Sequence, residues 1–206
     1  MKFLSKYRIP ITSEEKKQRR KERLLLIFSG IILGISFPPI PFPFTLLIFV
    51  GLVPYFIVIR KRTTLSSISS ATFLFSFFFS ITTIYWVGSW SSEADPYLML
   101  AGVALLLAYP TVMLIPSTLF YLARKVFPKF DALWLFPLFW VTLEYLLTLT
   151  DLRFPWLLLG HGLAKFNWFI QGADIIGTNG LSLVVAYINV LLFKAFFQKM
   201  TCKEEH

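Results

Sequence analysis

Glu144 is the residue of this sequence best placed for chemistry, because it is a carboxylate within an otherwise apolar run. At helical spacing it shares one face with Trp140 and Thr148, and Asp151 continues that face. An ionisable side chain in a membrane-length run is costly and marks a functional site by default. We expect this polar stripe to face other helices or a wet cavity. Two interpretations stay open: a carboxylate that only packs helices together, and one that handles a substrate.

An aromatic loop follows the carboxylate. Phe154, Pro155 and Trp156 form an amphipathic turn of the kind found where a membrane meets water. His161 lies between two glycines and has the chemistry of a general base, with Asp174 as its candidate partner. The alternative is that His161 is a hydrogen-bonded structural residue of an interfacial loop.

A second small-residue segment precedes the last apolar run. Glycine and asparagine tolerate positive φ, so this segment predicts a turn that ends in a helix entry. Its polar and small residues are Asp174, Gly177, Asn179 and Gly180. We expect Ser182 to satisfy free N–H groups at the start of that helix, and Asn189 to bond across helices.

The composition predicts an integral membrane protein of the all-α class. Hydrophobic residues make up 56% of the chain and charged residues 15%, against ~25% charged in an ordinary soluble domain. Apolar runs are long enough to cross a bilayer, so we expect a bundle of about six transmembrane helices. The six candidate spans are Leu24–Pro38, Phe42–Ile59, Ser70–Val87, Tyr97–Ala123, Asp131–Thr150 and Gly180–Phe197. The fourth span carries Pro110 and Pro116, so we expect kinks in it.

The charges predict the topology. With both termini in the cytoplasm, 18 of the 20 Lys and Arg residues fall on the cytoplasmic side, and only Arg153 and Lys165 lie outside. This asymmetry follows the positive-inside rule. It accounts for the formal charge of +9 without nucleic acid as a partner.

Three regions are expected along the chain: a basic cytoplasmic tail (1–23), a transmembrane domain (24–198) and a polar cytoplasmic tail (199–206). Thr12 and Glu15 have the spacing of a capping box. The basic tail is therefore either a short helix from about Ser13 or, the preferred interpretation, a solvated tail along anionic lipid. The two histidines are far apart and Cys202 is the single cysteine, so we expect no metal or other cofactor.

The chain resembles the N-terminal membrane domain of bacterial apolipoprotein N-acyltransferases. The resemblance covers nearly all residues after about 22, and Arg153 and His161 depart from the family pattern. The segments that carry it are Ser36-Phe37-Pro38-Pro39, Leu143-Glu144-Tyr145-Leu146, Phe154-Pro155-Trp156-Leu157, Gly160, Gln171-Gly172-Ala173-Asp174, Gly177, Gly180-Leu181-Ser182 and Asn189.

This resemblance implies a setting for the function. The family transfers an acyl chain from a phospholipid to the N-terminal diacylglyceryl-cysteine of lipoproteins, in the bacterial inner membrane. Its catalytic Glu-Lys-Cys triad belongs to a nitrilase-like domain outside the membrane, and no residue here matches that triad. We therefore expect a truncated or split form, with no catalytic residue of its own, that provides anchoring and lipid access.

The expected partners are membrane phospholipids, a separately encoded nitrilase-like catalytic subunit and, in an active complex, lipoprotein substrates. The expected lipid portal contains Glu144, Phe154, Pro155, Trp156, Asp174, Gly177 and Gly180. The alternatives are a non-enzymatic scaffold or transporter, and a self-contained acyltransferase that works through His161.

Overall fold

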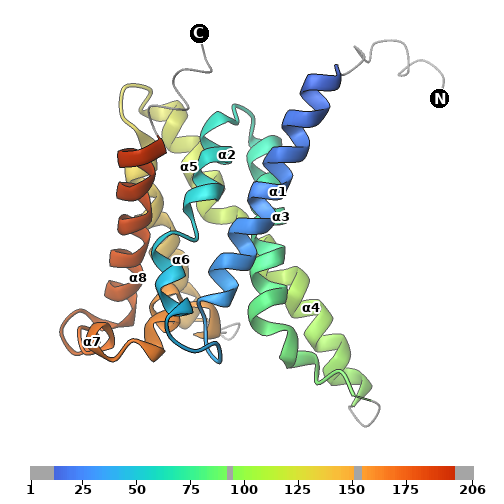
Figure 1. The fold of residues 1–206 in the computed structure, drawn as a ribbon, viewed down its shortest axis with the longest axis vertical. Helices are drawn as coiled ribbons and strands as arrows, with labels where there is room; N and C mark the ends of the chain where they lie inside the picture. Colours follow the sequence, from blue (N-terminus) through green and yellow to red (C-terminus); the bar gives the residue numbers. More distant parts are fainter. Residues whose placement is uncertain (1–11, 92–94, 151–154, 198–206) are drawn as a thin grey trace.

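The computed structural model describes residues 12–91, 95–150 and 155–197, and within these ranges the fold is all helical. The helices form a bundle with the described ends of the chain at the same end (Figure 1). In these ranges four segments are long and apolar enough to cross a membrane, and a shorter apolar helix accompanies them. The expected all-α membrane fold is confirmed. The four long segments are Phe44–Lys61, Leu65–Gly88, Pro96–Val126 and Ala173–Phe197, and the shorter one is Ala132–Thr148.

Helix α1 (Ser13–Ile35) begins at the capping box that the sequence suggests. The N–H of Glu15 donates to the Thr12 hydroxyl, and the Glu15 carboxylate accepts from the Thr12 N–H at 2.9 Å. These bonds satisfy two N–H groups that a helix start leaves free. The preferred interpretation of a merely solvated tail is therefore wrong for the residues from Ser13. They form a helix, with mostly exposed side chains, that continues into the first apolar run.

The second predicted span is broken in the middle. A 3-10 helix, η1 (Phe44–Phe49), is followed by a turn and then by α2 (Val53–Lys61). Such a break leaves backbone groups free within an apolar bundle, where each unsatisfied group is costly. Side chains from two other helices satisfy them: the Ser29 hydroxyl donates to the carbonyl of Gly51, and Asn189 binds on either side of the turn.

Asn189 on α8 (Ala173–Leu192) is fully buried. Its side-chain oxygen Oδ1 accepts from the backbone N–H of Leu52 at 2.9 Å, and its side-chain nitrogen Nδ2 donates to the backbone carbonyl of Ile48 at 2.8 Å. The predicted bonding of Asn189 across helices is therefore confirmed. One amide holds the last long helix against the break in the second span.

Helices α1 and α3 (Leu65–Ile84) pack along one another in close contact (Figure 1). A Cβ atom added at Gly30 would lie 2.4 Å from the carbonyl oxygen of Phe75. Glycine at this position therefore lets the two backbones approach, as small residues do between membrane helices.

The long fourth span bends, as its prolines predict. It consists of α4 (Pro96–Val112) and α5 (Leu114–Val126), which meet at Met113 between Pro110 and Pro116. Proline removes an N–H from the helix and clashes with the preceding turn. Helix α4 stays packed beside α3 and lies apart from α6 and α8 (Figure 1).

The remaining elements lead to the last long helix. Gly177 has φ of 70° within α8, so the predicted turn before the final helix is confirmed. Only glycine adopts that backbone conformation without strain. After α5 the described chain continues through η3 (Ala132–Leu135), α6 (Phe136–Thr148), η4 (Pro155–Leu157), η5 (Leu159–Lys165), α7 (Asn167–Ile170), α8 and the π-helical turn η6 (Phe193–Phe197).

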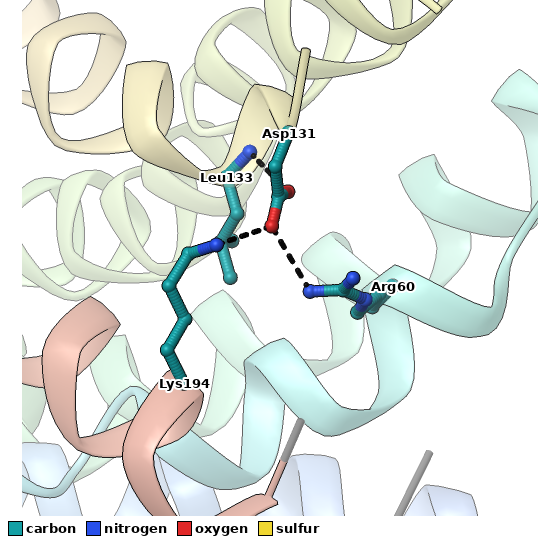
Figure 2. A network of polar contacts seen from close by, with 4 residues as sticks. All are labelled: Arg60, Asp131, Leu133 and Lys194. Atoms are coloured by element: carbon teal, nitrogen blue, oxygen red, sulfur yellow. Dashed lines mark hydrogen bonds and ion pairs between the residues drawn. The ribbon is translucent and has the colours of Figure 1, made fainter. Parts of the chain in front are cut away.

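The end of the bundle where α1 begins is called the basic end here. Three segments meet there at Asp131, as Figure 2 shows: its carboxylate pairs with Lys194 and with Arg60 at 3.2 Å, and accepts from the N–H of Leu133. Burial alone would raise the pKa of the Asp131 carboxyl group. The hydrogen bonds from Lys194 and Leu133 and the charge of Arg60 outweigh burial and lower that pKa.

Candidate functional site

Glu144 is 1% exposed and lies inside the bundle, on α6. Its Oε1 atom accepts two hydrogen bonds, from the indole N–H of Trp140 at 2.8 Å and from the backbone N–H of Leu159 at 2.9 Å. The first bond is made along α6, where residues four positions apart share a face. The second attaches the start of η5 to α6. The carboxylate therefore connects a membrane helix to the loop that follows it.

Glu144 and Tyr109 line a small cavity inside the bundle. In the part of the chain that the structure describes, the hydroxyl of Tyr109 makes no hydrogen bond. The volume of the cavity is about 10 Å³, close to that of a single water. A lipid does not fit there, so this geometry favours the helix-packing interpretation of Glu144 over direct contact with substrate.

The segment after Glu144 is fastened to α8 as well. The N–H of Gly160 donates to the hydroxyl of Ser182 at 2.8 Å. We expected the Ser182 hydroxyl to bond a free N–H group at the start of its own helix. This expectation is corrected, because the hydroxyl oxygen accepts from the N–H of Gly160 in η5. The approach is close, because a Cβ atom at Gly160 would lie 2.4 Å from the carbonyl oxygen of Thr178.

A larger pocket opens at the end of the bundle opposite the basic end. Its volume is about 540 Å³, and its lining is mostly apolar. Trp86 and Trp156 meet there edge to face, with ring centroids 5.8 Å apart. We call it the aromatic pocket. It is lined by Phe37, Pro38, Pro39, Thr83, Ile84, Tyr85, Trp86, Trp156, His161, Ala164 and Lys165.

The aromatic pocket brings together two of the residues that the sequence singled out, Trp156 and His161. Trp156 is 57% exposed, as an interfacial anchor should be. Pro155 begins η4, whereas Asp151 and Phe154 lie outside the described residues.

The predicted turn residues lie elsewhere. Asp174 is exposed in the first turn of α8 and does not line the aromatic pocket, and Gly177 is also exposed. Gly180 packs against Ile176 one turn earlier. The turn from Asp174 to Gly180 and the loop of Trp156 therefore do not line the aromatic pocket together.

Sequence reasoning missed the other wall of the aromatic pocket. Phe37, Pro38 and Pro39 come from the turn after α1, and Tyr85 and Trp86 come from the 3-10 helix η2 (Tyr85–Gly88). Phe37, Pro38 and Pro39 belong to a segment that carries the family resemblance, but the sequence did not connect that segment with Trp156. Among the residues with described positions, no three His, Cys, Asp or Glu side chains gather as a metal site.

Comparison with known proteins gives a consistent match. Residues 29–191 match the family described as apolipoprotein N-acyltransferase N-terminal domain. Three proteins named apolipoprotein N-acyltransferase are similar over most of this chain. The one from Geobacter metallireducens is 31% identical over 85% of this chain and 33% of its own length. Those from Chlorobaculum tepidum and Rickettsia prowazekii are 25% and 27% identical, over 87% and 88% of this chain and 32% and 36% of their own lengths. The chain thus spans about a third of the length of these curated relatives.

Proposed function

Because the chain belongs to the apolipoprotein N-acyltransferase family, whose N-terminal domain it spans, we propose that its helices hold a phospholipid for acyl transfer. In this reaction an ester bond of the phospholipid breaks, and its acyl group forms an amide with the N-terminal amine of a lipoprotein's diacylglyceryl-cysteine. The lysophospholipid leaves with a free hydroxyl, which takes up the proton that the amine releases. The proposed location is the bacterial inner membrane.

The aromatic pocket is the observation that carries this proposal. Its volume of about 540 Å³ and mostly apolar lining suit part of an acyl chain. Lys165 lines the same pocket and offers a cation to a phosphate group. Trp156 and Trp86 supply amphipathic rings at the level where lipid headgroups begin. The aromatic pocket thus has an apolar lining for an acyl chain and a cation for an anionic headgroup.

The remaining roles follow from this placement. Glu144 is a positioning residue, because it fixes η5, which supplies His161 and Lys165 to the aromatic pocket. Phe154, Pro155 and the turn from Asp174 through Gly177 to Gly180 are proposed to border the lipid entrance. The acylating nucleophile is proposed to come from a nitrilase-like catalytic unit beyond the matched third of the relatives. A separately encoded unit of this kind is the proposed partner.

Filling the aromatic pocket tests the proposal. The chain is produced together with its catalytic unit in cells without other N-acyltransferase activity, and mass spectrometry measures the acylated fraction of a lipoprotein. Ala164 is exposed and lines the pocket, so Ala164→Trp should occupy it without disturbing the core. Asn167→Trp adds the same ring at an exposed position outside the pocket and serves as the matched control.

We expect at least a tenfold lower acylation rate for Ala164→Trp, about 1.4 kcal/mol in the barrier, and an unchanged rate for Asn167→Trp. Trp156→Ala should also lower the rate, whereas Trp168→Ala, at an 89% exposed position on α7, should not. Full acylation with the pocket filled, or in cells that lack this chain, would contradict the proposal. The second of these results would favour a non-enzymatic membrane scaffold.

A further inference from the structure

A second large groove lies between α1 and α3, at the basic end of the bundle. Its volume is about 810 Å³. Both helices run from the basic end towards the opposite end of the bundle (Figure 1), so residues early in each helix lie nearest the basic end. The groove shares no lining residue with the aromatic pocket.

The end of this groove nearest the basic end is cationic. Arg19, Arg23 and Arg62 line it, and the hydroxyl residues Ser67 and Ser70 lie among them. Such a cluster of guanidinium groups and hydroxyls suits the oxygens of a phosphate group.

One carboxylate is present beside these arginines. Glu22 forms an ion pair with Arg62, whose guanidinium also donates to the hydroxyl of Ser67 at 3.1 Å. The Nε atom of Arg62 is buried, and within the described part of the chain it makes no hydrogen bond. The cluster therefore keeps an excess of positive charge and a free donor after its own ion pair is counted.

The other end of the groove is apolar. Leu26 of α1 and Phe73, Leu74 and Phe77 of α3 line it, and Phe73 is 37% exposed. The order from charged to apolar is the same along both helices. A small anion such as inorganic phosphate would use the cationic half alone and would leave the apolar half without a role.

We propose that this groove binds an anionic phospholipid, with the phosphate at the arginines and an acyl chain along Phe73 and Phe77. The arginines complement an anionic headgroup, and the order from charged to apolar residues along both helices matches the order from headgroup to acyl chain in a lipid. Basic pockets between membrane helices are suited to such headgroups. The site is separate from the aromatic pocket, so the lipid bound here is a structural or regulatory ligand and not the acyl donor.

Native mass spectrometry of the full chain in neutral detergent tests the site, with diacyl phosphatidylglycerol as the probe. Arg19→Gln/Arg23→Gln removes two charges that line the groove. Lys16→Gln/Arg20→Gln removes two charges at the same spacing on the same helix, outside the groove, and is the matched control.

We expect the groove pair to weaken phosphatidylglycerol binding by about thirtyfold, or about fivefold for each basic residue, and the control pair to leave it within about twofold. Equal weakening by both pairs would overturn the proposal, because it would show only general attraction to a basic helix. Phosphatidylcholine that binds as tightly as phosphatidylglycerol would also overturn it.

Filling the groove is a second test. Ser70→Trp places a ring in the groove at an exposed position, and Ser66→Trp places one on the same helix outside it. Ser70→Trp should reduce phosphatidylglycerol binding about tenfold or more, and Ser66→Trp should not change it. Soluble glycerol phosphate that competes equally well with the lipid would show a phosphate site and would contradict a lipid site.

Discussion

Oε1 of Glu144 on α6 lies 2.9 Å from the backbone nitrogen of Leu159, the first residue of η5. The N–H of Leu159 donates to this oxygen, which also accepts from the indole of Trp140. Because η5 carries His161 and Lys165 into the aromatic pocket, a buried carboxylate holds one wall of the pocket without lining it.

Replacing Glu144 should separate its hydrogen bonding from its charge. Glu144→Ala leaves the N–H of Leu159 buried and unpaired, so we expect the free energy of unfolding to fall by about 1–3 kcal/mol. Glu144→Gln keeps a carbonyl oxygen as acceptor and should lose less. Thermal unfolding in detergent measures both. An alanine variant as stable as the original chain would show that this carboxylate does not hold η5.

The contact between Gly160 and α8 should not tolerate a methyl group. A Cβ atom there would lie 2.4 Å from the carbonyl oxygen of Thr178, which is backbone and cannot turn aside. We expect Gly160→Ala to lower the free energy of unfolding by about 1–3 kcal/mol through overpacking. Gly172→Ala, where the nearest atom is at 3.1 Å, is the milder comparison. Equal stability of the two variants, measured by thermal unfolding, would contradict this close approach.

The sequence predicted the features that depend on local chemistry. Proline at 110 and 116 predicted the bend between α4 and α5, and glycine at 177 predicted the turn within α8. The break between η1 and α2 also has local signals, Gly51 in the turn and Pro54 in the first turn of α2, but the expected second span runs through both residues without a break. The side chains that satisfy the break, Ser29 and Asn189, come from other helices and could not be read from the local sequence.

The candidate site also combines features that the local sequence predicts with features that depend on contacts between distant segments. The position of Glu144 in an apolar run marked it as unusual, but its partner Leu159 is a backbone group that no residue pattern reveals. The aromatic pocket combines the turn after α1, the end of η2 and the loop of Trp156. Only tertiary packing brings these three segments together, so the sequence identified one wall and missed the other.

Asp131 should make the stability depend on acid pH. Its pKa is lowered in the folded chain, so its ionised form stabilises the fold above the ordinary aspartate pKa of about 3.9. That contribution is lost as the pH falls through the lower folded-state value. Asp131→Asn removes the charge but keeps an oxygen that can accept from the N–H of Leu133.

The unfolding temperatures of the original chain and of Asp131→Asn should therefore differ at neutral pH, and the difference should shrink as the pH falls below the ordinary aspartate pKa of about 3.9. The expected difference is small, because Asp131 and its partners are partly exposed and solvent screens their attraction. A difference that stays constant over this range would show that the charge of Asp131 does not contribute.

Asn189 gives the sharpest test of the bundle, because its side chain bonds to the backbone on both sides of the break between η1 and α2. Asn189→Ala leaves the N–H of Leu52 without its partner inside the bundle, and we expect a loss of about 1–3 kcal/mol in the free energy of unfolding. Asn179→Ala is the matched control on the same helix. The amide nitrogen of Asn179 makes no hydrogen bond within the described ranges, so its removal should cost less. Chemical unfolding in detergent compares the two variants. If both lose the same stability, the break is held by packing and not by the Asn189 amide.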